Sequence, residues 1–247
     1  MRLTRLYVAA TIAQGSVLEL PAEPATHVAR VLRGRSGDPL VLFNGDGREF
    51  AAVIDQVRGT RVSVTVGAPS IPQCEAPWPI TLLQSVPRGE RMDWIVQKAT
   101  ELGVARIVPL VSRRCVVRLD PEQGEAKAAH WHAVAVAACE QSGRTRLPTI
   151  ERPRRLDEFL GEPADGRLRL LLDPLATGEP RGERVFESIE VAVGPEGGFE
   201  AEEIDWFRLA GFAGLRLGPR ILRTETAAVA AMVWLQSSYG DLRAGLG

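Results

Sequence analysis

The sequence predicts a small all-β domain followed by an α/β domain with a mostly parallel sheet. Three observations support this prediction: short alternating apolar runs fill residues 17–66, prolines gather in residues 67–79, and strand-like runs alternate with helical periodicity from residue 80 onward. We place the domain boundary in the proline-rich stretch, with a first domain at 1–72 and a second at 73–247. A chain of 247 residues is long enough to bury a core in each domain.

The first domain is expected to be a small barrel-like sheet. Turn signals such as Asn44-Gly45-Asp46-Gly47 separate the apolar runs. A short helix over 27–32 follows Pro24. The four predicted strands are residues 17–20, 40–43, 50–57 and 61–66. Beyond them, prolines that fix φ and remove backbone donors indicate a linker: Pro69, Pro72, Pro77 and Pro79.

The second domain is predicted to alternate strands with helices, which implies a parallel sheet covered on both faces. A first helix is indicated by one apolar face that ends at Gly103, namely Met92, Ile95, Val96, Ala99 and Leu102. A second is centred on Trp131, Val134, Ala135 and Ala138. The predicted strands are 80–86, 107–111, 168–172, 190–193 and 215–217, and the last two helices are 200–210 and 226–238.

Composition and charge narrow the class of protein. The hydrophobic share is 45%, and no run of 18 apolar residues offers a membrane span, so we expect a soluble chain. Three widely spaced cysteines and an N-terminus without a secretory pattern favour the cytoplasm. The net charge of −1 neither supports nor excludes a nucleic-acid partner, but bases outnumber acids between residues 85 and 118 and again around 144–155. Such excess is typical of phosphate contacts, or of a solvated surface.

Several kinds of chemistry lack their usual motifs. His130 and His132 diverge on a helix and the cysteines form no C-x-x-C pair, so no metal site is expected. A G-x-S-x-G elbow, a P-loop and a G-x-G-x-x-G fingerprint are all missing from the sequence, which disfavours hydrolases, NTPases and dinucleotide-binding enzymes.

Two glycine-proline loops each follow a predicted strand. One is residues 194–198 and the other is residues 217–226. Loops past the carboxyl ends of parallel strands form the ligand crevice of such sheets, and glycines let the backbone approach a ligand. The simpler alternative is a pair of tight turns, with Thr224 or Thr226 as the N-cap of the last helix. A third polar segment, Glu140 to Arg144, reads as a functional helix end or as an ordinary one with Gly143 as its C-cap.

Taken together, these segments resemble the family of small-subunit (16S) ribosomal RNA uridine N3-methyltransferases, within the SPOUT class of trefoil-knotted enzymes that use S-adenosyl-L-methionine (AdoMet). The resemblance covers nearly the whole chain. It runs through residues 2–7, 27–33, 88–93, 97–104, 112–115, 138–141 with Arg144, 194–198 and 217–226. It implies a PUA-like β-barrel that helps bind RNA, a knotted AdoMet-binding domain, a homodimer, and a substrate that is small-subunit ribosomal RNA or the assembled subunit, with no membrane and no metal.

The resemblance also implies site residues. Those expected around AdoMet are Leu172, Gly194, Pro195, Glu196, Gly198, Leu217, Gly218, Ile221, Leu222 and Thr226. Because uridine N3 carries a proton that must leave, we expect Glu225 as a base, with Arg223 or Arg144 stabilising charge on the uracil oxygens. Residues expected to contact RNA are Arg2, Arg5, His27, Arg30, Arg33, Arg88, Arg91, Arg113, Arg114, Glu140 and Gln141.

Three other functions stay open. The enzyme could modify another RNA position, including a ribose 2′-hydroxyl, which mapping of modified nucleosides would reveal. It could be an RNA-binding assembly factor without catalysis, which would show no saturable uptake of AdoMet. A small-molecule methyltransferase is the third alternative, but it would leave the first domain and the arginines without a purpose.

Overall fold

The computed structural model describes residues 3–115, 120–161, 166–177 and 186–242. The chain divides into two compact units, the first formed by Met1–Glu75 with Val136–Leu147 and the second by Ala76–Ala135 with Pro148–Gly247. The end of one long helix and the turn after it therefore belong to the first unit, although they come late in the sequence. The division into domains at 1–72 and 73–247 stays a prediction.

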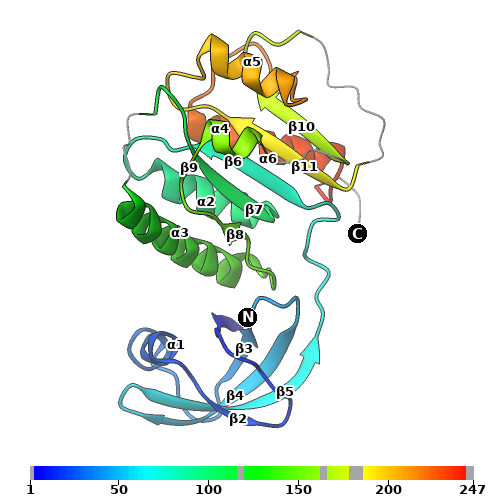
Figure 1. Ribbon diagram of the computed structural model, residues 1–247. Helices are drawn as coiled ribbons and strands as arrows, with labels where there is room; N and C mark the ends of the chain where they lie inside the picture. The colour runs from blue at the N-terminus through cyan, green and yellow to red at the C-terminus, as the bar shows by residue number, and fades with distance from the viewer. Residues whose placement is uncertain (1–2, 116–119, 162–165, 178–185, 243–247) are drawn as a thin grey trace. The chain divides into compact units, whose positions relative to one another are not determined.

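The first unit is built on a mixed five-stranded sheet (Figure 1). Its strands are β1 Thr4–Tyr7, β2 Val17–Glu19, β3 Pro39–Phe43, β4 Glu49–Arg58 and β5 Arg61–Ser70, in the order β1-β3-β4-β5-β2. β1 pairs with β3 in parallel and the other pairs are antiparallel. Phe50, Ala52 and Ile54 alternate with exposed residues, so one face of β4 is buried in the core of this unit. β1 was not predicted, because its four residues mix Arg5 with apolar neighbours.

The helical segment of the first unit is longer than predicted. It begins with α1, Ala22–Thr26, and continues as a π-helical segment, η1, His27–Leu32. Arg33 ends it with φ 53° and ψ 39°, a left-handed conformation that glycine adopts more readily. The glycine stands one residue later, because a Cβ at Gly34 would lie 2.8 Å from Cγ1 of Val28.

The described strands of the second unit pair in parallel, which agrees with the predicted mostly parallel sheet. Its strands are β6 Ile80–Ser85, β7 Arg106–Val111, β8 Thr149–Ile150, β9 Arg154–Arg155, β10 Arg167–Leu172, β11 Ser188–Val193 and β12 Ala213–Leu215. The order is β12-β10-β11-β6-β7-β8, and β9 also pairs with β7. The two-residue strands β8 and β9 were not predicted, and β12 ends two residues earlier than the expected strand 215–217, because its register with β10 ends at Leu172 and Leu215.

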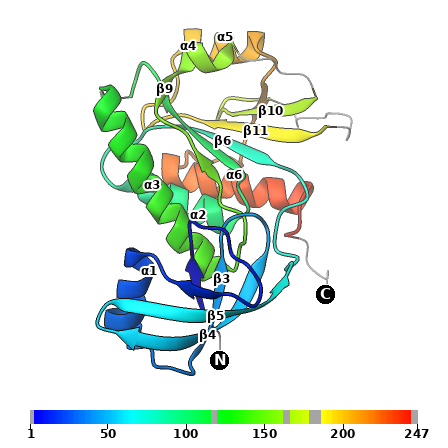
Figure 2. The same ribbon diagram turned by 60° about the horizontal axis from the view of Figure 1, so that its bottom comes forward.

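Helices cover both faces of this sheet (Figures 1 and 2). α2 Arg91–Glu101, α6 Thr224–Ser238 and the first part of α3 Pro121–Ser142 pack on one face, while α4 Leu156–Leu160 and α5 Ala201–Leu209 pack on the other. α3 is much longer than its apolar positions suggested, and α4 was missed. None of the described helices is long and apolar enough to cross a membrane. The trefoil knot stays a prediction.

Candidate active site

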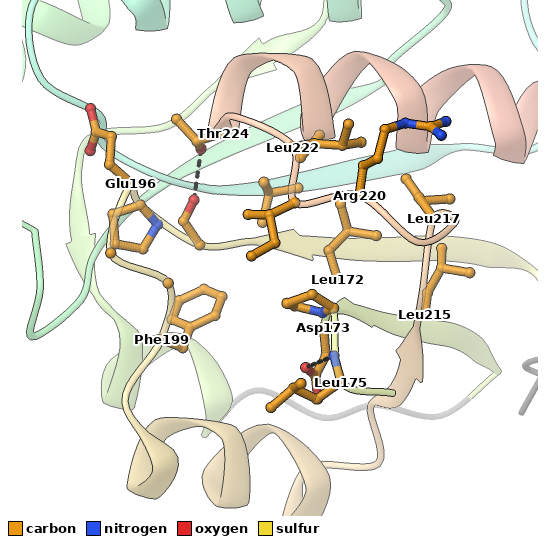
Figure 3. A pocket seen from close by; sticks show the side chains of 18 of the residues that line it. Leu172, Asp173, Leu175, Glu196, Phe199, Leu215, Leu217, Arg220, Leu222 and Thr224 are labelled. Atoms are coloured by element: carbon orange, nitrogen blue, oxygen red, sulfur yellow. Dashed lines mark hydrogen bonds between the residues drawn. The ribbon is translucent and has the colours of Figure 1, made fainter. Parts of the chain in front are cut away.

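A pocket of about 300 Å³ lies where β10, β11 and β12 end. This is the edge at which parallel α/β sheets bind ligands. Three loops form it: the two glycine-proline loops and the turn after β10, of which the sequence analysis had named only Leu172 (Figure 3). Its lining residues are Leu172, Asp173, Pro174, Leu175, Val193, Gly194, Pro195, Glu196, Gly197, Gly198, Phe199, Ile204, Leu215, Leu217, Gly218, Arg220, Ile221, Leu222, Thr224 and Ala227.

The loop after β11 needs its glycines. A Cβ at Gly194 would lie 3.2 Å from the Cα of Gly198 and from the ring of Phe199, so a side chain there would press on the turn. Gly198 has φ +68°, and its amide donates to the carbonyl of Pro195. These constraints keep backbone rather than side chains at this part of the pocket wall.

Thr224 joins the two glycine-proline loops. Its hydroxyl donates to the carbonyl oxygen of Gly194 at 2.7 Å (Figure 3). It also accepts from Nε2 of Gln84 at 2.9 Å. Gln84 is fully buried at the end of β6, and Thr224 is 4% exposed. The N-cap of α6 is Arg223, without a side-chain cap bond, so the expectation that Thr224 or Thr226 caps this helix is wrong. The hydroxyl of Thr224 instead links the two glycine-proline loops.

Glu196 is held at the rim of the pocket by the segment before α2. The amide of Arg88 donates to its Oε1 at 3.0 Å, and the guanidinium of Arg91 pairs with the same oxygen. Partial burial works to raise the pKa of the Glu196 carboxyl, but its own amide, that of Arg88 and the charge of Arg91 outweigh burial and lower the pKa. Glu196 is therefore a fixed carboxylate.

Most of the residues expected around AdoMet do line this pocket. Nine of the ten lie in its wall, whereas Thr226 is exposed on the first turn of α6 and lies outside it. The additions that sequence reasoning missed include Asp173, which is 9% exposed and accepts from the amide of Leu175 at 2.8 Å, and the apolar side chains of Leu175 and Phe199. These residues stand beside ones that were expected, Asp173 after Leu172 and Phe199 after Gly198. The strand order, which brings the ends of β10, β11 and β12 together, is what places them in one pocket wall.

The three residues expected to act in catalysis are not in the pocket wall. Glu225 lies on the first turn of α6, where its Oε1 is 3.8 Å from Nε of Arg91 and its Oε2 is buried without a hydrogen-bond partner among the described residues. Arg223 is exposed as the N-cap residue. Arg144 is 5% exposed in the first unit and donates to Oε2 of Glu75 at 2.8 and 3.0 Å. Their catalytic roles stay predictions.

The residues expected to contact RNA fall into two groups. Exposed residues without an ion pair among the described residues are His27, Arg30, Arg33, Arg88 and Gln141. The others are engaged within the protein. Arg5 pairs with Glu49, Arg113 pairs with Glu200 and Glu202, and Arg114 donates to the carbonyl of Gly197 at 2.7 Å. Arg91 is bound as above, and Arg2 lies outside the described residues.

Glu140 is a half-buried anchor in the first unit. Its Oε1 accepts from the amide of Tyr7 at 2.9 Å. Burial raises the pKa of its carboxyl, and the Tyr7 amide only partly offsets that effect. Gly143 ends α3 with φ +93°, as the sequence predicted for a C-cap.

The chemistry of the pocket suits an organic ligand with a flat apolar ring and a positive charge. Leucines, Val193 and Phe199 supply apolar walls, the glycine loops supply backbone groups, and Asp173 and Glu196 supply carboxylates. Across the described part of the chain, no cluster of three His, Cys, Asp or Glu side chains could hold a metal ion. None of the three cysteines is in a disulfide.

The chain matches two families of protein domains. Residues 74–236 match one described as an RNA methyltransferase domain, and residues 20–66 match one described as an RNA methyltransferase PUA domain. Among curated proteins, the ribosomal RNA small subunit methyltransferase E of Buchnera aphidicola subsp. Schizaphis graminum is 30% identical over 243 residues, 98% of each chain. The protein of the same name from Mycobacterium tuberculosis is 32% identical over 230 residues, covering 88% of this chain and 85% of that one.

Solved structures agree with these sequence matches. A putative methyltransferase from Legionella pneumophila, in complex with the bound cofactor SAM, superposes with a TM-score of 0.93 at 41% identity, covering 98% of this chain and all (100%) of that one. A ribosomal RNA small subunit methyltransferase E from Neisseria gonorrhoeae bound to S-adenosyl methionine gives a TM-score of 0.92 at 32% identity with the same coverage.

Proposed function

Because this chain belongs to the ribosomal RNA small subunit methyltransferase E family, we propose that it transfers a methyl group from AdoMet to N3 of a uridine in small-subunit (16S) ribosomal RNA. The observation that carries the proposal is the pocket at the ends of β10, β11 and β12, which contains nine of the ten residues expected around the cofactor. The family relationship supplies the reaction class, and the pocket supplies a place for the donor.

The residues of the pocket fit AdoMet by their chemistry. The apolar walls suit an adenine ring, and the glycine backbone suits the polar edge of that ring. AdoMet carries a sulfonium and an ammonium group, and the carboxylates of Asp173 and Glu196 favour such positive charge. When bound, AdoMet supplies an electrophilic methyl group. The protein has to hold a uridine in line with it and take up the N3 proton.

Glu225 is our candidate for the group that takes up the proton. It sits one residue beyond Thr224, which lines the pocket, and its Oε2 has no hydrogen-bond partner among the described residues. Arg223, next to it and exposed, is placed to stabilise negative charge on a uracil oxygen. Arg144 is the weaker candidate for that role, since its guanidinium is already bound to Glu75.

The test is labelled methyl transfer to small ribosomal subunits that lack the modification, followed by nucleoside analysis. We expect N3-methyluridine, and a ribose-methylated nucleoside would contradict the proposal. Glu225→Gln should slow transfer by roughly a hundredfold, within the usual range for a general base, and leave AdoMet affinity unchanged in calorimetry. Full activity of this variant at every pH would remove Glu225 as the base.

We further propose that the enzyme works in the cytoplasm as a homodimer and that RNA contacts the exposed basic side chains of both units, among them Arg30, Arg33 and Arg88. Sedimentation velocity tests the dimer. A variant with all three arginines changed to alanine should bind RNA more weakly, with a salt dependence reduced by about three counterions. An unchanged salt slope would contradict the proposed contacts.

A further inference from the structure

The second unit contains another cavity, outside the pocket described above. It has a volume of about 490 Å³ and lies between residues 86–93, which form the link from β6 and the first turn of α2, and one face of α3. Lys127, His130 and Trp131 form that face, because residues three and four apart share one side of a helix. The cavity follows the carboxyl end of β6, and so lies at the same edge of the sheet as the first pocket.

The floor of this cavity is apolar, and hydrogen bonds hold its polar groups in place. Val86, Met92 and Trp131 are at most 4% exposed. Both oxygens of Asp93 are occupied, one by Nε2 of His130 at 2.7 Å and the other by the indole N–H of Trp131 at 3.1 Å. With Nε2 bound to Asp93, Nδ1 of His130 is left for another partner. The carboxylate of Asp93 therefore orients His130.

One basic side chain stands at the rim. Lys127 lines the cavity and is exposed, and its side chain has no ion pair among the described residues. Glu90 also lines the cavity and is exposed, and its carboxylate has no ion pair among the described residues. An apolar floor below one free cation and a hydrogen-bonding edge suits a nucleotide, whose base is flat and whose phosphate is an anion.

One short segment separates the cavity from the first pocket. Residues 87, 89, 90, 92 and 93 line the cavity, while Arg88 and Arg91 in the same segment bind Glu196, which lines the first pocket. The two hollows therefore share a wall. An RNA strand whose target base faces AdoMet at the first pocket therefore brings a neighbouring nucleotide to the second.

We propose that this cavity is a subsite for a single-stranded RNA nucleotide next to the target uridine. The base rests on the floor of Val86, Met92 and Trp131, where Nδ1 of His130 and the carboxylate of Glu90 meet its polar edge. The phosphate binds Lys127. This subsite rests on the proposed function, because it takes the same RNA substrate as the methyl-transfer site.

The experiment measures the KM for unmodified small subunits and the AdoMet affinity of the full chain with single substitutions. Lys127→Ala should raise the subunit KM roughly tenfold, the equivalent of one lost charge-assisted contact, and reduce the salt slope of RNA binding by about one. His130→Ala should raise the subunit KM roughly fivefold, which corresponds to the loss of a weaker contact. The matched controls are His132→Ala, exposed on the same helix but outside the cavity, and Arg208→Ala, exposed on α5. Both should behave as wild type.

The outcomes separate the subsite from the function it rests on. If wild-type enzyme neither binds AdoMet nor methylates subunits, the proposed function fails. If wild type is active and Lys127→Ala and His130→Ala match the two controls, the subsite alone is overturned. Saturable binding of free uridine monophosphate that Lys127→Ala abolishes, with an unchanged subunit KM, would also overturn it, because the ligand would then be a free nucleotide. AdoMet affinity and thermal unfolding should stay unchanged in both variants.

Discussion

Thr224 shows how much one hydroxyl group can determine at the residue scale. It donates to Gly194 from one pocket loop to the other and accepts from the buried amide of Gln84. Two loops that are thirty residues apart in sequence are joined by this single side chain. Because the bond to Gly194 fixes the two loops that form the pocket, we expect its loss to change the shape of the pocket.

Removing the hydroxyl tests this directly. Thr224→Val keeps the shape of the side chain but leaves the carbonyl of Gly194 without its donor, and we expect AdoMet to bind roughly tenfold more weakly, the effect of about 1.4 kcal/mol. Thr224→Ser keeps the hydroxyl and should bind AdoMet within about twofold of wild type, a difference well below that energy. The control is Ser112→Ala, which breaks the buried Ser85–Ser112 hydroxyl pair at 2.5 Å and reaches neither loop. Equal AdoMet affinity in the valine and serine variants would contradict the proposal that this hydroxyl shapes the pocket by linking its two loops.

Cys139 gives a second prediction at this scale. It is fully buried, and burial raises the pKa of its thiol to about 12, partly offset by the charge of Arg144. The unfolded thiol ionises near 9, so between about pH 9 and 12 the folded state holds a proton that the unfolded state has lost. The contribution of the Cys139 thiol to the free energy of unfolding is therefore complete below about pH 9 and decreases as the pH rises toward 12. Urea unfolding of Cys139→Ala should therefore show a smaller decrease over this range than wild type, and parallel curves would contradict the assignment.

At the scale of the element, the end of α2 depends on one glycine. Gly103 has φ +82°, and a Cβ there would lie 2.8 Å from Nε2 of Gln236 and 3.2 Å from Cβ of Ala76. The same Gln236 amide donates to the carbonyl of Leu102 at 2.7 Å, which ties α6 to the end of α2. The periodicity of α2 and its stop at Gly103 were predicted, but the partner from α6 was not.

Alanine at this position should be costly. Gly103→Ala combines left-handed strain with displacement of the Gln236 amide, and we expect a loss of about 2–3 kcal/mol in the free energy of unfolding. Gly211→Ala is the matched control, since Gly211 has φ +84° but open space around its Cβ, so only the strain of about 1 kcal/mol applies. Urea unfolding compares the two. Equal losses would show that the contact with Gln236 carries no weight.

At the scale of the whole molecule, the chain is interleaved between its two units. The end of α3 and the following turn, residues 136–147, count with the first unit. Glu75 holds them there: its Oε2 accepts from the guanidinium of Arg144, and its Oε1 accepts from the amides of Thr145 and Arg146 at 3.1 and 3.0 Å. Arg5 adds a bond of 3.1 Å to the carbonyl of Arg144.

This ion pair separates two roles for Arg144. If Arg144 serves structure, Arg144→Met and Glu75→Gln should both lower the free energy of unfolding by about 2–3 kcal/mol, less than for a fully dry pair because Glu75 keeps 21% of its side-chain exposure. Both should then keep the wild-type kcat below their unfolding temperatures. We expect this result. Loss of kcat in Arg144→Met alone would restore the catalytic role that the sequence suggested.

The sequence by itself determined the parallel sheet, most of its strands and the two glycine-proline loops, because periodicity and turn chemistry are local properties of the chain. It also carried the family resemblance. Which loops share a pocket, which arginines are already paired and which carboxylates stand free depend on strand order and long-range contacts. Only the tertiary structure could decide these, and so only it added Asp173 and Phe199 to the pocket and turned Thr224 from an expected cap into a tie between the loops.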